Sequence, residues 1–210
     1  MRVSIPSSES LVRLHACPPG FALLAAEALT REAATASRFT DQRREEWLAG
    51  RILARRAVAD VLGCDPSDVV IDVTGDGAPY VVGEFDVGVS ISHTRDLVVA
   101  GAVRGPWLGV DVEWADRDVS RLMRALSPVE AEWAGAVGAV SLLVAKEAAA
   151  KSWGVGLGGS LGRWPVESVE ADVIVVGSPL GDSRSVGMCD LDGAVVGVCA
   201  ERISGISVSH

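Results

Sequence analysis

Lysine is scarce in this chain of 210 residues: Lys146 and Lys151 are its only lysines, and the other basic side chains are arginine. Acidic residues outnumber basic ones by 28 to 19, which gives a formal net charge of −9 at pH 7. Broad nucleic-acid binding needs a basic surface, so this balance argues against that class of partner.

Cysteine and histidine are also few. The four cysteines show no C-x-x-C spacing, and one of the three histidines is the last residue. We therefore expect reduced thiols and no His/Cys metal cluster. Any metal would be held by carboxylates, which favours Mg²⁺ or Mn²⁺.

Long apolar runs are absent as well. The longest, such as residues 173–176, fall far short of the roughly 20 residues that span a bilayer. The first ten residues lack the charged and then apolar pattern of a signal peptide. We expect a cytoplasmic protein that has no membrane partner.

Hydrophobic residues make up 49% of the chain, enough for a core in one large domain or two small lobes. The patterns predict helices first, then strands of period two, then helices and strands again. This order indicates an α+β fold of two similar lobes, about 1–105 and about 106–210, each pairing a small antiparallel sheet with a long helix. The helices are expected at residues 21–36, 41–62, 119–126, from 128 onward and around 146–151.

The second predicted helix carries a row of arginines. Arg44, Arg51 and Arg55 are spaced i, i+7 and i+11, which places them close to one line on the helix surface. They form either a solvated face balanced by nearby acids or a fork of guanidinium groups for phosphate, which planar arginine donors suit.

Two carboxylates, Asp111 and Glu113, lie two apart on a predicted strand (GVDVE, residues 109–113) and therefore point to the same face. Such a pair is hard to bury without a cation, and a divalent metal would relieve the repulsion. An edge strand with its polar face in water is the alternative.

Two further segments carry polar groups that suit a site. His93 ends a strand at a turn (SISHT, residues 90–94), where its role is either structural or ligand binding. In KEAAAK (residues 146–151), Glu147 and Lys151 are four apart and share a helix face, which by itself requires no more than a surface ion pair.

Taken in order, these segments resemble the motifs of the surfactin-type 4′-phosphopantetheinyl transferases. The motifs are G-R-x-x-x-R at residues 50–55, S-H-T at 92–94, G-V-D-x-E at 109–113, and K-E-A-x-x-K at 146–151 followed by glycines. The resemblance implies a pseudo-twofold pair of α+β lobes with coenzyme A in the cleft between them. It also implies a monomer that acts on carriers of fatty-acid synthesis or of secondary-metabolite assembly.

The implied reaction is attack by a carrier-protein serine on the β-phosphorus of coenzyme A, with release of adenosine 3′,5′-bisphosphate. By matching position, the metal ligands for Mg²⁺ are Asp111, Glu113 and Glu147. The catalytic residues are Glu147 as base, directly or through a water, with Lys151 and His93 offsetting phosphate charge. The residues expected to contact coenzyme A are Arg44, Arg51, Arg55, Thr74, Gly75, Ser92, His93, Lys146 and Lys151.

Two positions depart from the family pattern: Ala78 replaces the usual lysine of a G-K-P turn, and Leu143 replaces a tryptophan. The acidic carrier protein is expected to dock on a basic, partly apolar segment. The alternative is that the arginines of this segment only form a solvated helix face. This segment contains Arg117, Arg121, Leu122, Met123 and Arg124. Two other hypotheses are a Mg²⁺-dependent pyrophosphate hydrolase acting on a nucleotide and a scaffold that binds coenzyme A or a carrier without catalysis.

Overall fold

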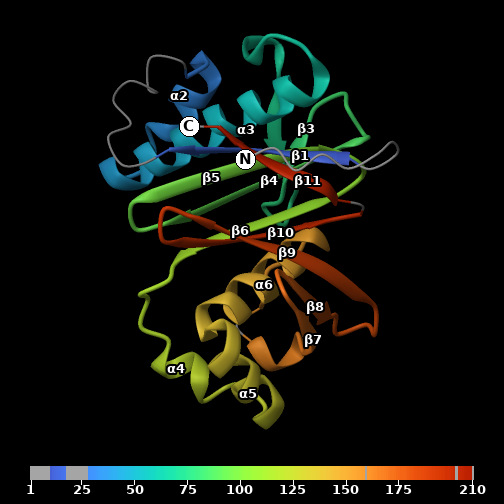
Figure 1. The fold of residues 1–210 in the computed structure, drawn as a ribbon. Helices are drawn as coiled ribbons and strands as arrows, with labels where there is room; N and C mark the ends of the chain where they lie inside the picture. The colour runs from blue at the N-terminus through green and yellow to red at the C-terminus, as the bar shows by residue number, and fades with distance from the viewer. Residues whose placement is uncertain (1–9, 18–27, 159, 202, 210) are drawn as a thin grey trace. The chain divides into compact units, whose positions relative to one another are not determined.

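The computed structural model describes residues 10–17, 28–158, 160–201 and 203–209 (Figure 1). It has the mixed α+β character predicted from the sequence. The chain divides into two compact units: unit 1 contains Met1–Trp107 and Glu201–His210, and unit 2 contains Leu108–Ala200. The last strand therefore belongs to unit 1, whereas the sequence pattern assigned it to the second lobe.

Unit 1 consists of a four-stranded sheet in the order β11-β1-β5-β4, a two-stranded sheet of β2 and β3, and the long helix α3. Its elements are β1 (Ser10–Cys17), α2 (Thr30–Ala36), α3 (Asp41–Leu62), η1 (Pro66–Asp68), β2 (Ile71–Val73), β3 (Pro79–Val81), β4 (Val87–Thr94), β5 (Leu97–Arg104) and β11 (Ile203–Ser209).

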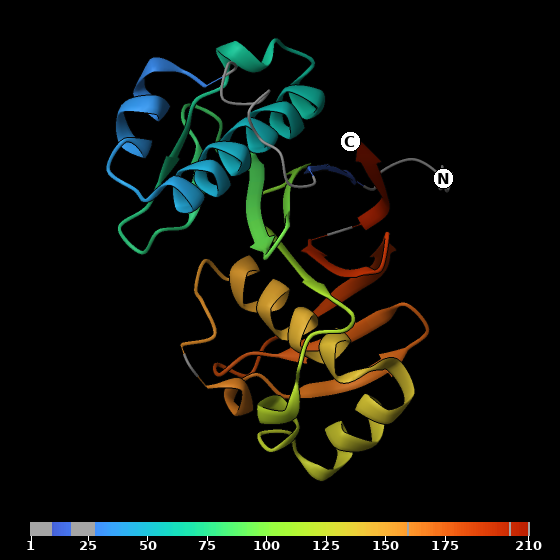
Figure 2. The ribbon, with the colours of Figure 1, turned by 90° about the vertical axis from the view of Figure 1, so that its left-hand side faces the viewer.

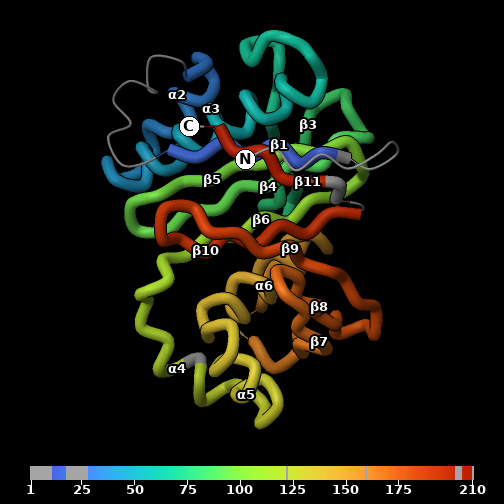
Figure 3. The backbone as a smooth tube through the Cα atoms, viewed as in Figure 1, coloured from blue at the N-terminus to red at the C-terminus, as the bar shows by residue number. Residues whose placement is uncertain are grey.

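The larger sheet of unit 1 is mixed, which corrects the prediction of an antiparallel sheet. β1 pairs antiparallel with β5 but parallel with β11, so two segments from opposite ends of the chain lie side by side (Figure 3). Sequence periodicity cannot reveal this pairing, because the partners are almost 200 residues apart.

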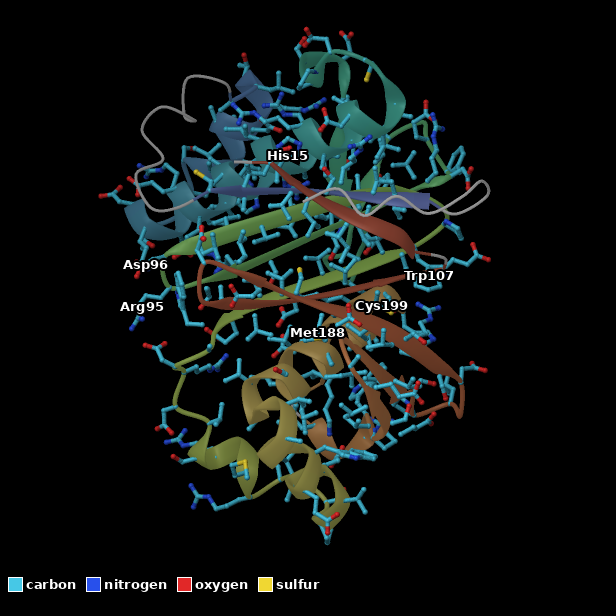
Figure 4. The ribbon with its side chains drawn as sticks, in the orientation of Figure 1. His15, Arg95, Asp96, Trp107, Met188 and Cys199 are labelled. Atoms are coloured by element: carbon cyan, nitrogen blue, oxygen red, sulfur yellow. The ribbon has the colours of Figure 1, made fainter. Side chains whose placement is uncertain are left out.

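Helix α3 has the bounds that the sequence predicts. It begins after Thr40 and ends at Gly63, whose φ of 73° is the left-handed conformation that glycine adopts readily. Its apolar face packs on the sheet, and a Cβ at Gly50 would lie 2.8 Å from Ile91 Cγ2, so glycine permits the close approach to β4. On β1, His15 reaches the same helix through a 2.9 Å contact between its Nε2 and Asp60 Oδ2 (Figure 4).

Unit 2 is a five-stranded antiparallel sheet, ordered β6-β10-β9-β8-β7, with α6 against one face and α5 packed on α6 (Figure 2). Its elements are β6 (Leu108–Trp114), α4 (Ser120–Met123), α5 (Pro128–Val137), α6 (Ala139–Ser152), η2 (Leu161–Arg163), β7 (Val166–Glu170), β8 (Val173–Gly177), β9 (Ser183–Leu191) and β10 (Ala194–Ala200).

The helices of unit 2 follow the predicted pattern except that α4 is one turn long. α5 begins with the predicted capping box, in which Ser127 and Glu130 satisfy each other's backbone N–H groups. No single helix in the described part of the chain is long and apolar enough to span a membrane. α5 and α6 reach that composition only as a pair bent by 110°.

Candidate functional site

Strand β6 and helix α6 bring the three predicted metal-binding carboxylates to one region of unit 2. A Cβ at Gly109 would lie 1.9 Å from the carbonyl oxygen of Ala148, so the strand touches the helix backbone at this glycine. Asp111 and Glu113 follow at intervals of two and therefore point to the same, α6-covered face. Glu147 lies on α6, one residue before the contact with Gly109.

A short ion pair joins the strand to the helix. Lys151 Nζ lies 2.7 Å from Asp111 Oδ1 and also donates to the carbonyl of Val110 at 3.1 Å. The Asp111 side chain is 8% exposed and the Lys151 side chain 29% exposed. The two motif residues are thus direct partners, and Lys151 retains a solvent-facing portion.

Glu113 is held in a similar way by a cation from the segment that follows β6. Its Oε2 pairs with the guanidinium of Arg117, and its Oε1 accepts a hydrogen bond from the backbone N–H of Trp114 at 2.9 Å. The sequence pattern assigned Arg117 to carrier docking, whereas the structure places it at the carboxylate cluster.

Glu147 is the residue whose charge this environment disfavours most clearly. Burial raises the pKa of Glu147, and the neighbouring charge of Asp111 raises it further. Lys151 and Arg117 act in the opposite direction, while Glu113 adds a small upward effect. A carboxylate with a raised pKa beside two cations is suited to accept a proton.

The chemistry of this cluster fits a hard divalent cation. Three carboxylates that lie close enough to affect one another's charge supply the oxygen ligands that Mg²⁺ prefers. Within the described ranges, however, no three His, Cys, Asp or Glu side chains form a preassembled metal site. In this arrangement Lys151 and Arg117 neutralise the carboxylates.

Lys146 has a different role from the predicted one. Its side chain has no exposed surface, and its Nζ lies 2.6 Å from Glu130 Oε1, which also accepts from the backbone N–H of Val166 at 3.0 Å. Lys146 also donates to the carbonyl of Leu161 at 3.3 Å. The prediction that Lys146 contacts a phosphate is corrected, because a fully buried ammonium in this ion pair cannot reach a ligand.

Two of the three predicted arginines of α3 form ion pairs with neighbouring residues. Arg55 Nε lies 3.2 Å from Glu32 Oε1, with both side chains 4% exposed, and its Nη1 donates to the carbonyl of Pro66 at 3.0 Å. Arg44 pairs with Asp41 at 3.0 Å and donates to carbonyls that precede α3. The predicted phosphate contact is therefore corrected for Arg55, which joins α2 and η1 to α3. For Arg44, whose side chain is 40% exposed, contact with coenzyme A stays a prediction.

Arg51 remains available for an anion. Its guanidinium lies over the ring of Trp47, 4.9 Å from the ring centroid, and its Nη1 is buried without a hydrogen-bond partner among the described residues. Burial lowers the pKa of Arg51, partly offset by Glu32. A buried N–H donor that lacks an acceptor is costly unless a ligand supplies one.

The remaining predicted contacts to coenzyme A also lie in unit 1. Ser92 is buried on β4, whereas His93 is half exposed and its Nδ1 lies 3.9 Å from Glu46 Oε2. Thr74 and Gly75 lie in the exposed turn between β2 and β3, where Thr74 Oγ1 accepts from the backbone N–H of Ala78 at 3.1 Å.

One further residue, Arg184 of β9, carries no signal in the sequence. Its Nη1 donates to Ser152 Oγ at 2.7 Å, and its guanidinium lies 4.2 Å from the ring centroid of Trp153. Arg184 thus holds the two residues that follow Lys151. It was missed because nothing local to β9 indicates that the end of α6 lies beside it.

Comparison with known proteins gives one match to a family model. Residues 31–103, about a third of the chain, match the model of the 4′-phosphopantetheinyl transferase N-terminal domain. This match bears out the enzyme class predicted from the sequence. No curated protein matches the chain.

Among solved structures, the chain is similar to a holo-(acyl-carrier-protein) synthase from Bacillus anthracis str. Ames in complex with CoA (3',5'-ADP). The likeness is distant: identity is 19%, the TM-score is 0.39, and the match covers 45% of this chain and 94% of the other.

Proposed function

We propose that this protein transfers the 4′-phosphopantetheine arm of coenzyme A to a serine of an apo acyl or peptidyl carrier protein. The observation that carries the proposal is the placement of Glu147 beside the Asp111–Lys151 ion pair in unit 2. The family match of residues 31–103 supports the same class of enzyme. The motif set favours the two-lobed, surfactin-type branch of the family.

In this mechanism Glu147 accepts the proton of the attacking serine hydroxyl, directly or through a water. Its raised pKa makes it a better base than an ordinary surface carboxylate, and general-base catalysis contributes about 10²–10⁴-fold to a rate. Lys151 and Arg117 supply positive charge beside it. Such cations stabilise the charge that develops on the transferred and leaving phosphates.

Asp111, Glu113 and Glu147 would hold Mg²⁺, with Mn²⁺ as a substitute. When bound, the ion neutralises the pyrophosphate of coenzyme A as a Lewis acid. Ligand binding requires Lys151 and Arg117 to turn from the carboxylates toward phosphate oxygens, which long flexible side chains with exposed portions can do.

Unit 1 is assigned the nucleotide end of coenzyme A. The 3′-phosphate would provide an acceptor for the buried Nη1 of Arg51, which has none among the residues that the structure describes. His93 and the exposed turn at Thr74 and Gly75 contribute further polar contacts. Ala78 removes the lysine common at this turn, so Arg51 carries a larger share of the phosphate interaction.

The carrier protein is assigned to the segment after β6. Arg121 and Arg124 are exposed and Met123 is 41% exposed, which gives a basic and partly apolar surface that suits an acidic carrier. Arg117 lies at the start of this segment and pairs with Glu113, so the docking surface begins at the carboxylate cluster.

The decisive experiment incubates the protein with coenzyme A, Mg²⁺ and apo carrier proteins and determines the mass of each carrier. We expect a phosphopantetheine mass gain that is lost when Mg²⁺ is chelated or when Glu147 is changed to Gln. Consumption of coenzyme A without a carrier would indicate the hydrolase instead. Binding of coenzyme A with no mass gain on any of several unrelated carriers would indicate the scaffold.

A further inference from the structure

We propose that unit 1 carries a second interaction surface, an acidic groove that binds a protein segment containing both basic and apolar side chains. The groove has a volume of about 360 Å³ and lies between the end of α3, η1 and the β2–β3 sheet. Its apolar lining is formed by Leu62, Val69, Val70, Val81 and Val82. This surface is independent of the proposed transferase function.

Exposed apolar side chains flank the groove residues in the sequence. Val82, which lines the groove, is 46% exposed, Tyr80 on β3 is 42% exposed, and Phe85 is 93% exposed. Aromatic residues are enriched at protein interfaces and are unfavourable on an otherwise free surface. Exposed apolar and aromatic side chains next to the groove residues in the chain suit a protein segment better than a small molecule.

The rim of the groove is negative. Asp68 and Glu84 line it, and from residue 57 to residue 92 the sequence contains no Lys, Arg or His at all. The other carboxylates of this stretch are Asp60, Asp65, Asp72, Asp76 and Asp86.

Basic side chains of other elements that approach this region already have partners, and His15 pairs with Asp60 of the stretch at 2.9 Å. Arg31 Nη2 lies 3.5 Å from the carbonyl of Val69, and Arg55 donates to the carbonyl of Pro66 and pairs with Glu32. Among the residues that the structure describes, Asp68 and Glu84 themselves form no ion pair.

Charge complementarity selects the partner. An apolar floor with a carboxylate rim favours a segment whose apolar side chains enter the groove while its lysines or arginines meet the rim. An acidic carrier protein would be repelled here, so the groove is distinct from the basic docking segment around Arg121.

The test uses the full chain and a short amphipathic peptide of leucine and lysine, followed by amide chemical shifts and by titration of affinity. We expect shift changes confined to the region of Leu62 and to β2 and β3, with binding that weakens as salt rises. The same peptide with glutamate in place of lysine should not bind.

The matched variants separate this site from general attraction to an acidic protein. Asp68→Asn with Glu84→Gln should weaken peptide binding about fivefold, and Phe85→Ser should weaken it without loss of the fold, since Phe85 is 93% exposed. Glu170→Gln with Asp172→Asn, which removes the same charge from exposed positions of unit 2, should leave it unchanged.

The proposal would be overturned if the two double variants weakened peptide binding equally, or if the shift changes lay outside the groove. Sedimentation of the chain alone gives a further outcome. Self-association that Phe85→Ser abolishes would assign the surface to a second copy of this chain and would also overturn it.

Discussion

Lys146 Nζ lies 2.6 Å from Glu130 Oε1, and the two side chains expose only 0% and 5% of their surface. The same carboxylate closes the capping box of α5 and accepts the backbone N–H of Val166 at the start of β7. One ion pair thus joins α5, α6 and β7 next to Glu147. Of the two neighbouring residues, Lys146 therefore stabilises the fold, whereas Glu147 belongs to the candidate site.

Changing Lys146 to Met should destabilise the protein by about 3–5 kcal/mol, because it leaves the Glu130 charge buried and unpaired. Adding Glu130→Gln should restore much of the loss, since glutamine keeps an acceptor oxygen without the charge. Urea unfolding of the single and double variants measures both effects. A phosphate-binding role for Lys146 would instead give normal stability and a higher KM for coenzyme A.

Changing Glu147 to Gln should abolish transfer yet raise the free energy of unfolding at neutral pH. The raised pKa of Glu147 means that folding favours its neutral form. In the native protein this contribution to stability is fully present below the unfolded pKa of about 4.3 and is lost as pH rises through the folded pKa. Glutamine is neutral at every pH, so the stability of the variant should not fall over this pH range.

Denaturant unfolding across this pH range, with Glu170→Gln as an exposed control, checks the stability effect. If the Glu147→Gln variant is no more stable than the native protein at neutral pH, the charge of Glu147 does not destabilise the fold and the prediction fails.

Changing Arg51 to Met should raise the KM for coenzyme A roughly tenfold, because a hydrogen bond to a charged group contributes about 1.5–3 kcal/mol. Dephospho-coenzyme A, which lacks the 3′-phosphate, should show little change. Arg38→Met, at an exposed position of the same unit, serves as the control. An equal loss with both substrates would show that Arg51 does not contact the 3′-phosphate.

Changing Arg121 to Glu should raise the KM for the carrier protein several-fold and leave the KM for coenzyme A unchanged, since charge reversal at an exposed contact weakens association with an acidic partner. Arg163→Glu makes the same charge change at another exposed position of unit 2. Steady-state kinetics with a purified carrier compare the two. If both variants behave alike, the segment after β6 is not the docking surface.

Sequence patterns alone predicted the α+β class, the bounds of α3 and a helix around Glu147, because these depend on propensities and spacing within a few residues. It also predicted that Asp111 and Glu113 share a face, since that follows from the period of a strand. The close approach of β6 to α6 at Gly109 then brings those carboxylates to Glu147.

The three-dimensional structure was needed to show which charged side chains are buried in ion pairs. Arg55 and Lys146 look like ligand contacts in the sequence, yet each is buried in an ion pair with a residue from another element of its unit. The same holds for β11, which leaves the second lobe to pair with β1. Burial and pairing depend on contacts between residues distant in the chain, which local sequence patterns do not encode. The helix around Glu147 was therefore predictable, whereas the different roles of Lys146 and Lys151 were not.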